Sequence, residues 1–85
     1  MTRYRKNKYC RHAEVNNGLV IFNTKNNSAI EVDLITKELW FYFNNKILSK
    51  YDILSFYKKY DNEVDISMVD DAIEILMSEG VIYEC

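Results

Sequence analysis

The apolar residues of this chain change their spacing near Asp33, and this change constrains the fold more than any other feature. Before Asp33, short apolar runs are separated by polar turns, which is the pattern of β-strands. After Asp33, apolar residues recur every three or four positions, which is the pattern of amphipathic helices. A sheet followed by helices predicts an α+β fold.

Three strands are expected in the first third of the chain. Arg11–Val15 and Leu19–Asn23 are separated by Asn16-Asn17-Gly18, and asparagine and glycine tolerate the positive φ of a tight hairpin turn. A second polar turn leads into Ser28–Val32. We predict a three-stranded antiparallel meander with Leu19–Asn23 at its centre, because that segment is apolar on both faces. Ser28–Val32 is then an edge strand.

Three helices are expected in the remainder, over Leu34–Asn44, Lys50–Tyr60 and Ile66–Glu79. Each follows a side chain that can accept hydrogen bonds from the first helical turn, namely Asp33, Ser49 or Asp65. Gly80 is expected to end the third helix, because glycine adopts the left-handed conformation without penalty. The predicted order is that of a winged helix-turn-helix domain whose three-stranded antiparallel sheet precedes its three helices.

Composition indicates a single small globular domain over residues 1–85. Of these residues 48% are hydrophobic, and the chain has two glycines and no proline, so no segment has the composition of a linker. The longest apolar run, Leu39–Phe43, is far shorter than the ~20 residues that span a bilayer, and no apolar segment follows the basic start as in a secretory signal. We therefore expect a cytoplasmic protein without a membrane segment, in which Cys10 and Cys85 are free thiols.

Charge is distributed unevenly along the chain. Residues 1–13 contain basic residues and no acid, whereas residues 61–85 contain acids and no basic residue. Residues 1–8 are expected to form a basic N-terminal arm. The acidic third helix disfavours nucleic acid as a partner, because a recognition helix supplies basic and amide side chains to phosphates and bases.

Several segments share their spacing with a known family. They are the run Gly18–Asn23, the pairs Val32-Asp33 and Leu39-Trp40, the segment Ile47–Ile53, and the closing set Ile73, Leu76, Gly80, Val81 and Ile82. Together they cover about residues 13–83 and resemble the PqqD-like family, also called RiPP recognition elements. The chain departs from the family at Met68-Val69, where the family often has an acidic residue before an apolar one.

The resemblance implies a stand-alone domain that captures the leader segment of a ribosomally synthesised precursor peptide. In that family the leader adds as a strand to the third strand of the sheet, in a groove closed by the third helix. The precursor is delivered to a separate modifying enzyme, such as a radical-SAM protein, a cyclodehydratase, a lanthipeptide-forming enzyme or a leader protease. The domain itself is then neither an enzyme nor the holder of a cofactor.

The residues support the same kind of site independently of the family. An exposed edge strand can pair with an added peptide strand. The third helix has a second apolar stripe in which methionine lies beside a small residue, and its carboxylates favour a basic peptide. The expected peptide-binding residues are Ser28, Ala29, Ile30, Glu31, Val32, Met68, Asp71, Ala72, Ile75 and Glu79.

Other interpretations stay open beside this one. In one interpretation, Met68 and Ile75 belong to the edge of the hydrophobic core and bind nothing. In another, the acidic residues of the third helix simply form its solvent-exposed face. The edge strand could be covered by the N-terminal arm or by a second copy of the protein, which would make a homodimer. The alternative function is that of a winged-helix DNA-binding or regulatory protein.

Neither a metal site nor a catalytic site is expected. Cys10, His12 and Cys85 have metal-binding side chains but lack any recognised ligand spacing. The chain has one histidine, no glycine-rich phosphate loop and no nucleophile motif.

Overall fold

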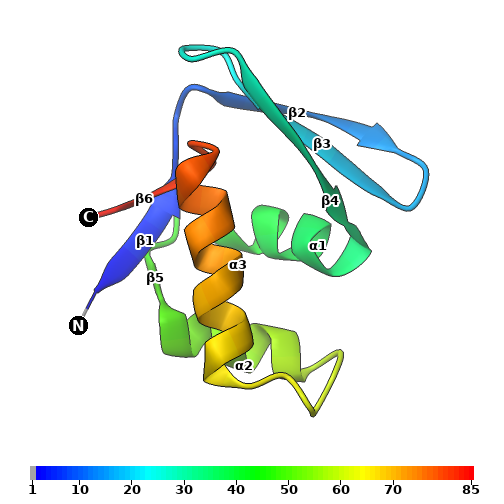
Figure 1. The fold of residues 1–85 in the computed structure, drawn as a ribbon, viewed down its shortest axis with the longest axis vertical. Coiled ribbons are helices and arrows are strands. Elements are labelled where there is room, and N and C mark those ends of the chain that lie inside the picture. The colour runs from blue at the N-terminus through cyan, green and yellow to red at the C-terminus, as the bar shows by residue number, and fades with distance from the viewer. Residues whose placement is uncertain (1) are drawn as a thin grey trace.

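The computed structural model describes residues 2–85, which form strands and helices in an α+β arrangement, as expected (Figure 1). In chain order the elements are β1 (Arg3–Lys6), β2 (Cys10–Val15), β3 (Gly18–Asn23), β4 (Ser28–Asp33), α1 (Leu34–Phe43), β5 (Leu48–Ser49), α2 (Lys50–Lys58), α3 (Ile66–Ser78) and β6 (Ile82–Glu84). The strands belong to two three-stranded antiparallel sheets, with orders β2-β3-β4 and β5-β1-β6.

The sheet β2-β3-β4 is the predicted meander. β3 is its central strand and β4 is an edge strand, and the prediction of both is confirmed. Asn17 takes the positive φ of the first turn, at 64°. Gly18 pairs with Val15 on one side and Asp33 on the other, and a Cβ there would lie 2.1 Å from the carbonyl oxygen of Val32. Only glycine permits this close approach.

The sheet β5-β1-β6 was not predicted, and it corrects the expected N-terminal arm. β1 is the central strand, in which Tyr4 pairs with Leu48 on one side and Glu84 on the other. Tyr4 is only 8% exposed. Residues 3–6 are therefore part of the folded domain, because the partners that order them come from the middle and the end of the chain.

Local capping explains where the three helices begin. Asp33 Oδ1 accepts from the Thr36 amide at 2.8 Å, and Asp65 Oδ1 accepts from the Met68 amide at 3.0 Å. Ser49 and Asp52 exchange the two hydrogen bonds of a capping box at the start of α2. α1 ends where the backbone turns to positive φ at Asn44 and Asn45, and α3 ends before Gly80, at φ 72°. The predicted caps and the predicted stop of α3 are confirmed.

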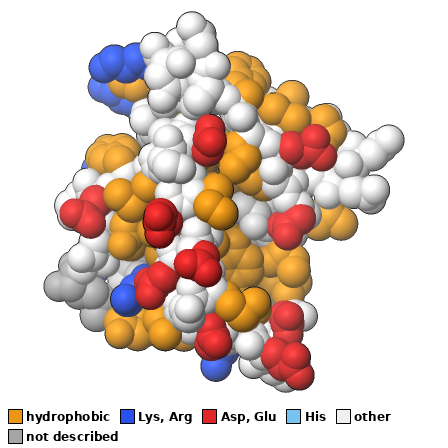
Figure 2. Space-filling model, viewed as in Figure 1, with side chains coloured by type: hydrophobic (Ala, Val, Ile, Leu, Met, Phe, Trp, Pro, Cys, Tyr) orange, Lys and Arg blue, Asp and Glu red, His pale blue; other side chains and the backbone are white. Residues whose placement is uncertain are grey.

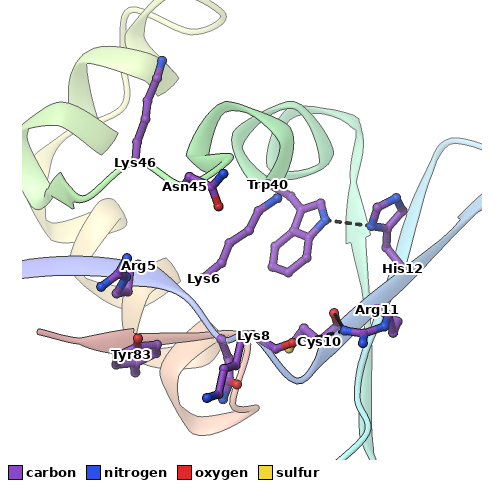
Figure 3. A pocket seen from close by; sticks show the side chains of 11 residues that line it. Arg5, Lys6, Lys8, Cys10, Arg11, His12, Trp40, Asn45, Lys46 and Tyr83 are labelled. Carbon is purple, nitrogen blue, oxygen red and sulfur yellow. Dashed lines mark hydrogen bonds between the residues drawn. The ribbon is translucent and has the colours of Figure 1, made fainter.

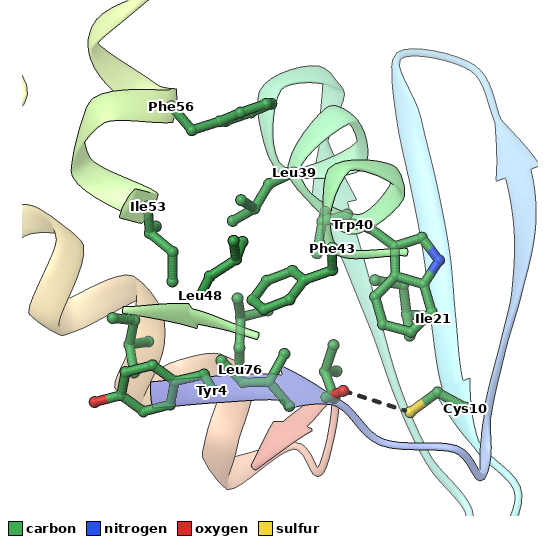
Figure 4. Packing of buried hydrophobic residues seen from close by; sticks show 14 of the residues in the cluster. Tyr4, Cys10, Ile21, Leu39, Trp40, Phe43, Leu48, Ile53, Phe56 and Leu76 are labelled. Carbon is green, nitrogen blue, oxygen red and sulfur yellow. Dashed lines mark hydrogen bonds between the residues drawn. The ribbon is translucent and has the colours of Figure 1, made fainter. Parts of the chain in front are cut away.

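The hydrophobic core joins both sheets to the helices (Figure 4). Leu19 and Ile21 contribute from β3, Leu39 and Phe43 from α1, and Ile53 from α2, and all five are nearly inaccessible to solvent. Val81 and Ile82, after α3, are also buried. Among residues 2–85, no helix combines the length and the apolar character needed to cross a bilayer.

Candidate peptide-binding groove

A groove runs between the edge strand β4 and the helix α3. It consists of two adjoining hollows of ≈ 270 Å³ each. Both hollows are lined by Asp33, Thr36, Tyr57 and Ala72, so they form one continuous depression. β4 pairs only with β3 within the described chain, and the edge that faces away from β3 is free of any strand of residues 2–85. Figure 2 shows hydrophobic side chains between α3 and the sheet β2-β3-β4, with carboxylates around them.

The walls of the groove are apolar. Ile30 and Val32 line it from β4, and Met68, Ala72 and Ile75 line it from α3. Met68 is 51% exposed and Ile75 is 53% exposed, so the second stripe of α3 lies at the surface and is not peripheral core. Large side chains held open to solvent along a depression are typical of a binding surface.

The floor of the groove contains a hydrogen bond between α1 and α2. The hydroxyl groups of Thr36 and Tyr57 lie 2.8 Å apart. Burial raises the pKa of Tyr57, the hydrogen bond with Thr36 opposes that rise, and the charge of Asp33 adds to it. The Tyr57 hydroxyl therefore stays protonated at neutral pH and keeps its capacity to donate.

Beyond one end of the groove, side chains of the sheet β2-β3-β4 bind the end of α3. Ser28 Oγ donates to the Glu79 carbonyl at 2.7 Å. Asn23 Nδ2 and Cys10 Sγ donate to the Gly80 carbonyl at 3.0 and 3.3 Å. These bonds satisfy the carbonyls of the C-cap residue and of the residue after it, and they fix the end of α3 against the sheet. The opposite end of the groove lies near Asp61 and Val64 in the α2–α3 connection.

The charged residues that line the groove are all acidic. Glu31, Asp33 and Asp61 lie along it, and no lysine or arginine lines either hollow. Asp71 and Glu74 line an adjoining shallow hollow of ≈ 410 Å³ that shares Ile75 with the groove. An apolar groove with an acidic border is complementary to a peptide that has both apolar and basic side chains.

The structure places the ten predicted binding residues in four groups. Six of them line the groove: Ile30, Glu31, Val32, Met68, Ala72 and Ile75. Asp71 lines the adjoining hollow, and Ser28 bonds to the Glu79 carbonyl beyond the groove. Ala29 is exposed and lines none of these hollows.

Several residues of the groove were missed by the sequence analysis. Thr36, Tyr57, Asp61 and Val64 come from α1, α2 and the connection that follows α2. Tyr57 has a visible signal in the sequence, because it belongs to the apolar stripe of α2. Its place beside β4 depends on how α2 packs against α1, which no local pattern specifies.

The cysteines and the histidine do not form a metal site. Within residues 2–85, no three side chains of His, Cys, Asp or Glu are grouped closely enough to hold an ion. Cys10 is buried and Cys85 is exposed, and both are free thiols. Burial raises the pKa of Cys10, against a smaller opposing effect of Arg11, so its thiol is protonated and donates to the Gly80 carbonyl.

Comparisons with protein-family models, with curated proteins and with solved structures found no match to this chain.

Proposed function

We propose that this protein binds an extended peptide by strand addition to β4, in the groove between β4 and α3. We further propose that the peptide is the leader segment of a ribosomally synthesised precursor, which the protein delivers to a separate modifying enzyme. One observation carries the proposal: the free edge of β4 borders an apolar groove whose other wall is α3.

Strand addition divides affinity and specificity between backbone and side chains. The free amides and carbonyls of an edge strand bind any extended peptide, and pockets beside the strand select alternate side chains. β4 has six residues, which matches a bound segment of about six residues. Side chains of that segment that point toward α3 would contact Ala72 and Ile75, and basic side chains at its ends would lie near Glu31 or Asp61.

The order of the elements supports the narrower assignment to leader recognition. A three-stranded meander, β2-β3-β4, precedes three helices, which is the order expected for a PqqD-like domain with a winged-helix arrangement. The expected binding surface of that family is the third strand of the meander together with the third helix. Here these elements are β4 and α3, the two walls of the groove.

The charge of α3 argues against the DNA-binding alternative. Helix α3 has no basic residue, and Asp70, Asp71 and Glu74 are exposed on it. Phosphates would be repelled from this face, whereas a recognition helix neutralises them. An electrophoretic mobility shift with random duplex DNA at moderate salt checks this, and a retarded band at micromolar protein would favour the alternative.

Titration of the purified protein tests the proposal directly. The ligand is a fluorescein-labelled leader peptide taken from a short reading frame encoded beside this protein, and fluorescence anisotropy gives the Kd. We expect saturable binding with a Kd below about 100 μM. Absence of binding at that concentration contradicts leader recognition.

A matched pair of variants locates the binding surface. Ile75→Glu places a charge on the groove wall and is expected to weaken binding at least about tenfold. Ile47→Glu makes the same substitution at a residue that is 42% exposed and does not line the groove, and it should change Kd less than about twofold. Equal effects of the two substitutions would place the peptide elsewhere. Circular dichroism verifies that both variants are folded.

A further inference from the structure

A second hollow, separate from the groove, is lined by positive charge (Figure 3). Its volume is ≈ 620 Å³. The charged side chains that line it are Arg5, Lys6, Lys8, Arg11 and Lys46, and no carboxylate is among its lining residues. None of its residues lines the groove. We call it the cationic hollow.

The fold holds these cations in place although they come from different segments. Arg5 and Lys6 lie on β1, the central strand of its sheet, and Lys46 lies in the connection between α1 and β5. Arg11 Nη1 donates to the carbonyls of Lys8 and Cys10, at 3.1 and 2.9 Å, which fixes the turn between β1 and β2. The backbone that carries the positive charges is thus ordered before any ligand arrives, which lowers the entropic cost of binding.

The cations of this hollow lack partners of opposite charge within the described chain. The ion pairs of residues 2–85 are Lys37–Glu14 and Lys50–Asp70, and neither involves the hollow. Lys6 Nζ lies 4.1 Å from the centre of the Trp40 ring, whose Nε1 donates to His12 Nδ1 at 3.1 Å. Desolvation at this place lowers the pKa of Lys6. A bound anion would compensate the desolvated ammonium and its unpaired neighbours.

We propose that the cationic hollow binds an acidic peptide segment of a protein partner. Several carboxylates on an extended segment can meet cations that β1, the β1–β2 turn and the α1–β5 connection present around one depression. Such a contact provides specificity and fast association, and it weakens as salt increases. This inference stands apart from the proposed use of the groove.

The aromatic rings near the hollow favour carboxylates over nucleic acid. Single-stranded nucleic acid binds where bases stack on open aromatic faces between basic side chains. Of the tryptophan and tyrosine rings that line the hollow, Trp40 is covered by Lys6, so that only Tyr83, which is 43% exposed, is left for stacking. Beside the hollow, Lys46 lies 4.0 Å from the centre of the Tyr42 ring and Lys25 lies 4.9 Å from that of Tyr9. An acidic peptide needs only the positive charges of the hollow for binding.

A synthetic probe and two matched variants test the inference. The probe is a fluorescein-labelled ten-residue peptide of alternating Glu and Ser, and its Kd is measured by anisotropy at low and at physiological salt. Lys8→Gln/Lys46→Gln removes two exposed charges from the hollow and should weaken binding about tenfold. Lys50→Gln/Lys58→Gln removes two lysines of α2 that do not line the hollow and should weaken it less than about twofold.

Backbone chemical shifts of the unaltered protein give a second readout that needs no variant. Adding the probe should shift amides of residues 5–12 and 45–46 and leave those of β4 and α3 unchanged. Equal weakening in the two variants, or shifts confined to α3, would overturn the inference. Tighter binding of a ten-nucleotide oligothymidylate would assign the hollow to nucleic acid instead. Salt-sensitive dimerisation in sedimentation, lost when Asp71 and Glu74 are replaced by Asn and Gln, would assign it to a second copy.

Discussion

Gly80 lies where helix α3 meets the sheet, and it has two reasons to be glycine. Its φ is 72°, a value that residues with a Cβ rarely adopt. A Cβ at this position would also lie 2.7 Å from Asn23 Nδ2. The same Asn23 nitrogen donates to the Gly80 carbonyl. A substitution at this residue therefore disturbs both the backbone and the hydrogen bond that joins the end of α3 to β3.

We expect Gly80→Ala to lower the free energy of unfolding by about 2–3 kcal/mol, from backbone strain and the lost hydrogen bond together. Urea denaturation measures this, with Ser78→Ala as a nearby exposed control that should change stability by less than about 0.5 kcal/mol. In an Asn23→Ala background the cost of Gly80→Ala should fall in part, because the closer of the two amides that a Cβ would meet is gone and only Asn26 Nδ2, at 3.0 Å, remains. A cost below that of the control would contradict the role assigned to Gly80.

Ionisation of Tyr57 makes the stability of the folded protein depend on pH in the alkaline range. Burial is the main cause that raises its pKa above the ordinary value of 10.0. Because the pKa of Tyr57 is higher in the folded than in the unfolded protein, its contribution to stability is complete at any pH below its pKa in the unfolded protein. The contribution is lost as the pH rises through its pKa in the folded protein. The loss therefore begins above about pH 10.

Urea denaturation of Tyr57→Phe from neutral to alkaline pH tests this dependence. At neutral pH the variant should lose about 1 kcal/mol, because Thr36 loses its partner. Above the ordinary tyrosine pKa its stability should fall less steeply than that of the unaltered protein. Tyr51→Phe changes a side chain that is 53% exposed and should keep the original pH dependence. Parallel curves for all three proteins would show that Tyr57 ionises as freely in the folded as in the unfolded state.

At the scale of secondary-structure elements, the sequence predicted the features that depend on contacts between residues close together in the chain. Asp33, Ser49 and Asp65 cap helices through atoms three residues away, so the helix starts could be found in the sequence. The meander was predicted for the same reason, because its strands are joined by short polar turns. Of the groove, β4 and the second stripe of α3 were found from alternation and helical spacing.

Non-local pairing explains what was missed. β1 contains one apolar residue, Tyr4, between arginines, and this short pattern resembles a solvated basic segment. Its strand conformation comes from pairing with Leu48-Ser49 and Ile82–Glu84, which are distant in the sequence. The same holds for Tyr57 and Asp61, which reach the groove only through the packing of α2.

The burial of Tyr4 predicts that β1 is essential to stability. Tyr4→Ala should cost about 3 kcal/mol, because it leaves a cavity under the central strand of the sheet β5-β1-β6. Tyr9→Ala, at a residue that is 38% exposed in the next turn, should cost less than about 1 kcal/mol. Thermal unfolding followed by circular dichroism compares the two. Similar melting temperatures of the two variants would indicate that β1 contributes little to the stability of the domain.

The whole molecule carries two surfaces of opposite charge that share no lining residue. The groove and its adjoining hollow contain acids without bases, and the cationic hollow contains bases without acids. The net charge of −2 conceals this separation. Such a molecule is suited to hold two different partners at once.

Independence of the two surfaces is a prediction at this scale. Ile75→Glu should weaken the leader peptide and leave binding of the Glu-Ser probe unchanged, and Lys8→Gln/Lys46→Gln should do the reverse. Substitutions at separate sites usually have additive effects, within about 0.5 kcal/mol, so the combined variant should show both losses unaltered. Competition between the two peptides for the unaltered protein would indicate one shared surface.

The sheet β5-β1-β6 also determines when the domain can finish folding during synthesis. β1 precedes the meander and the helices in the chain, and one of its two partners, β6, follows them, with the Cys85 amide donating to the Arg3 carbonyl at 3.0 Å. Until β6 emerges, one edge of β1 stays open while β2-β3-β4 and the capped helices can already form. Contacts between residues so far apart in the sequence form slowly. The cationic hollow, which needs β1 in place, therefore becomes complete only after the groove strand β4 has had time to pair.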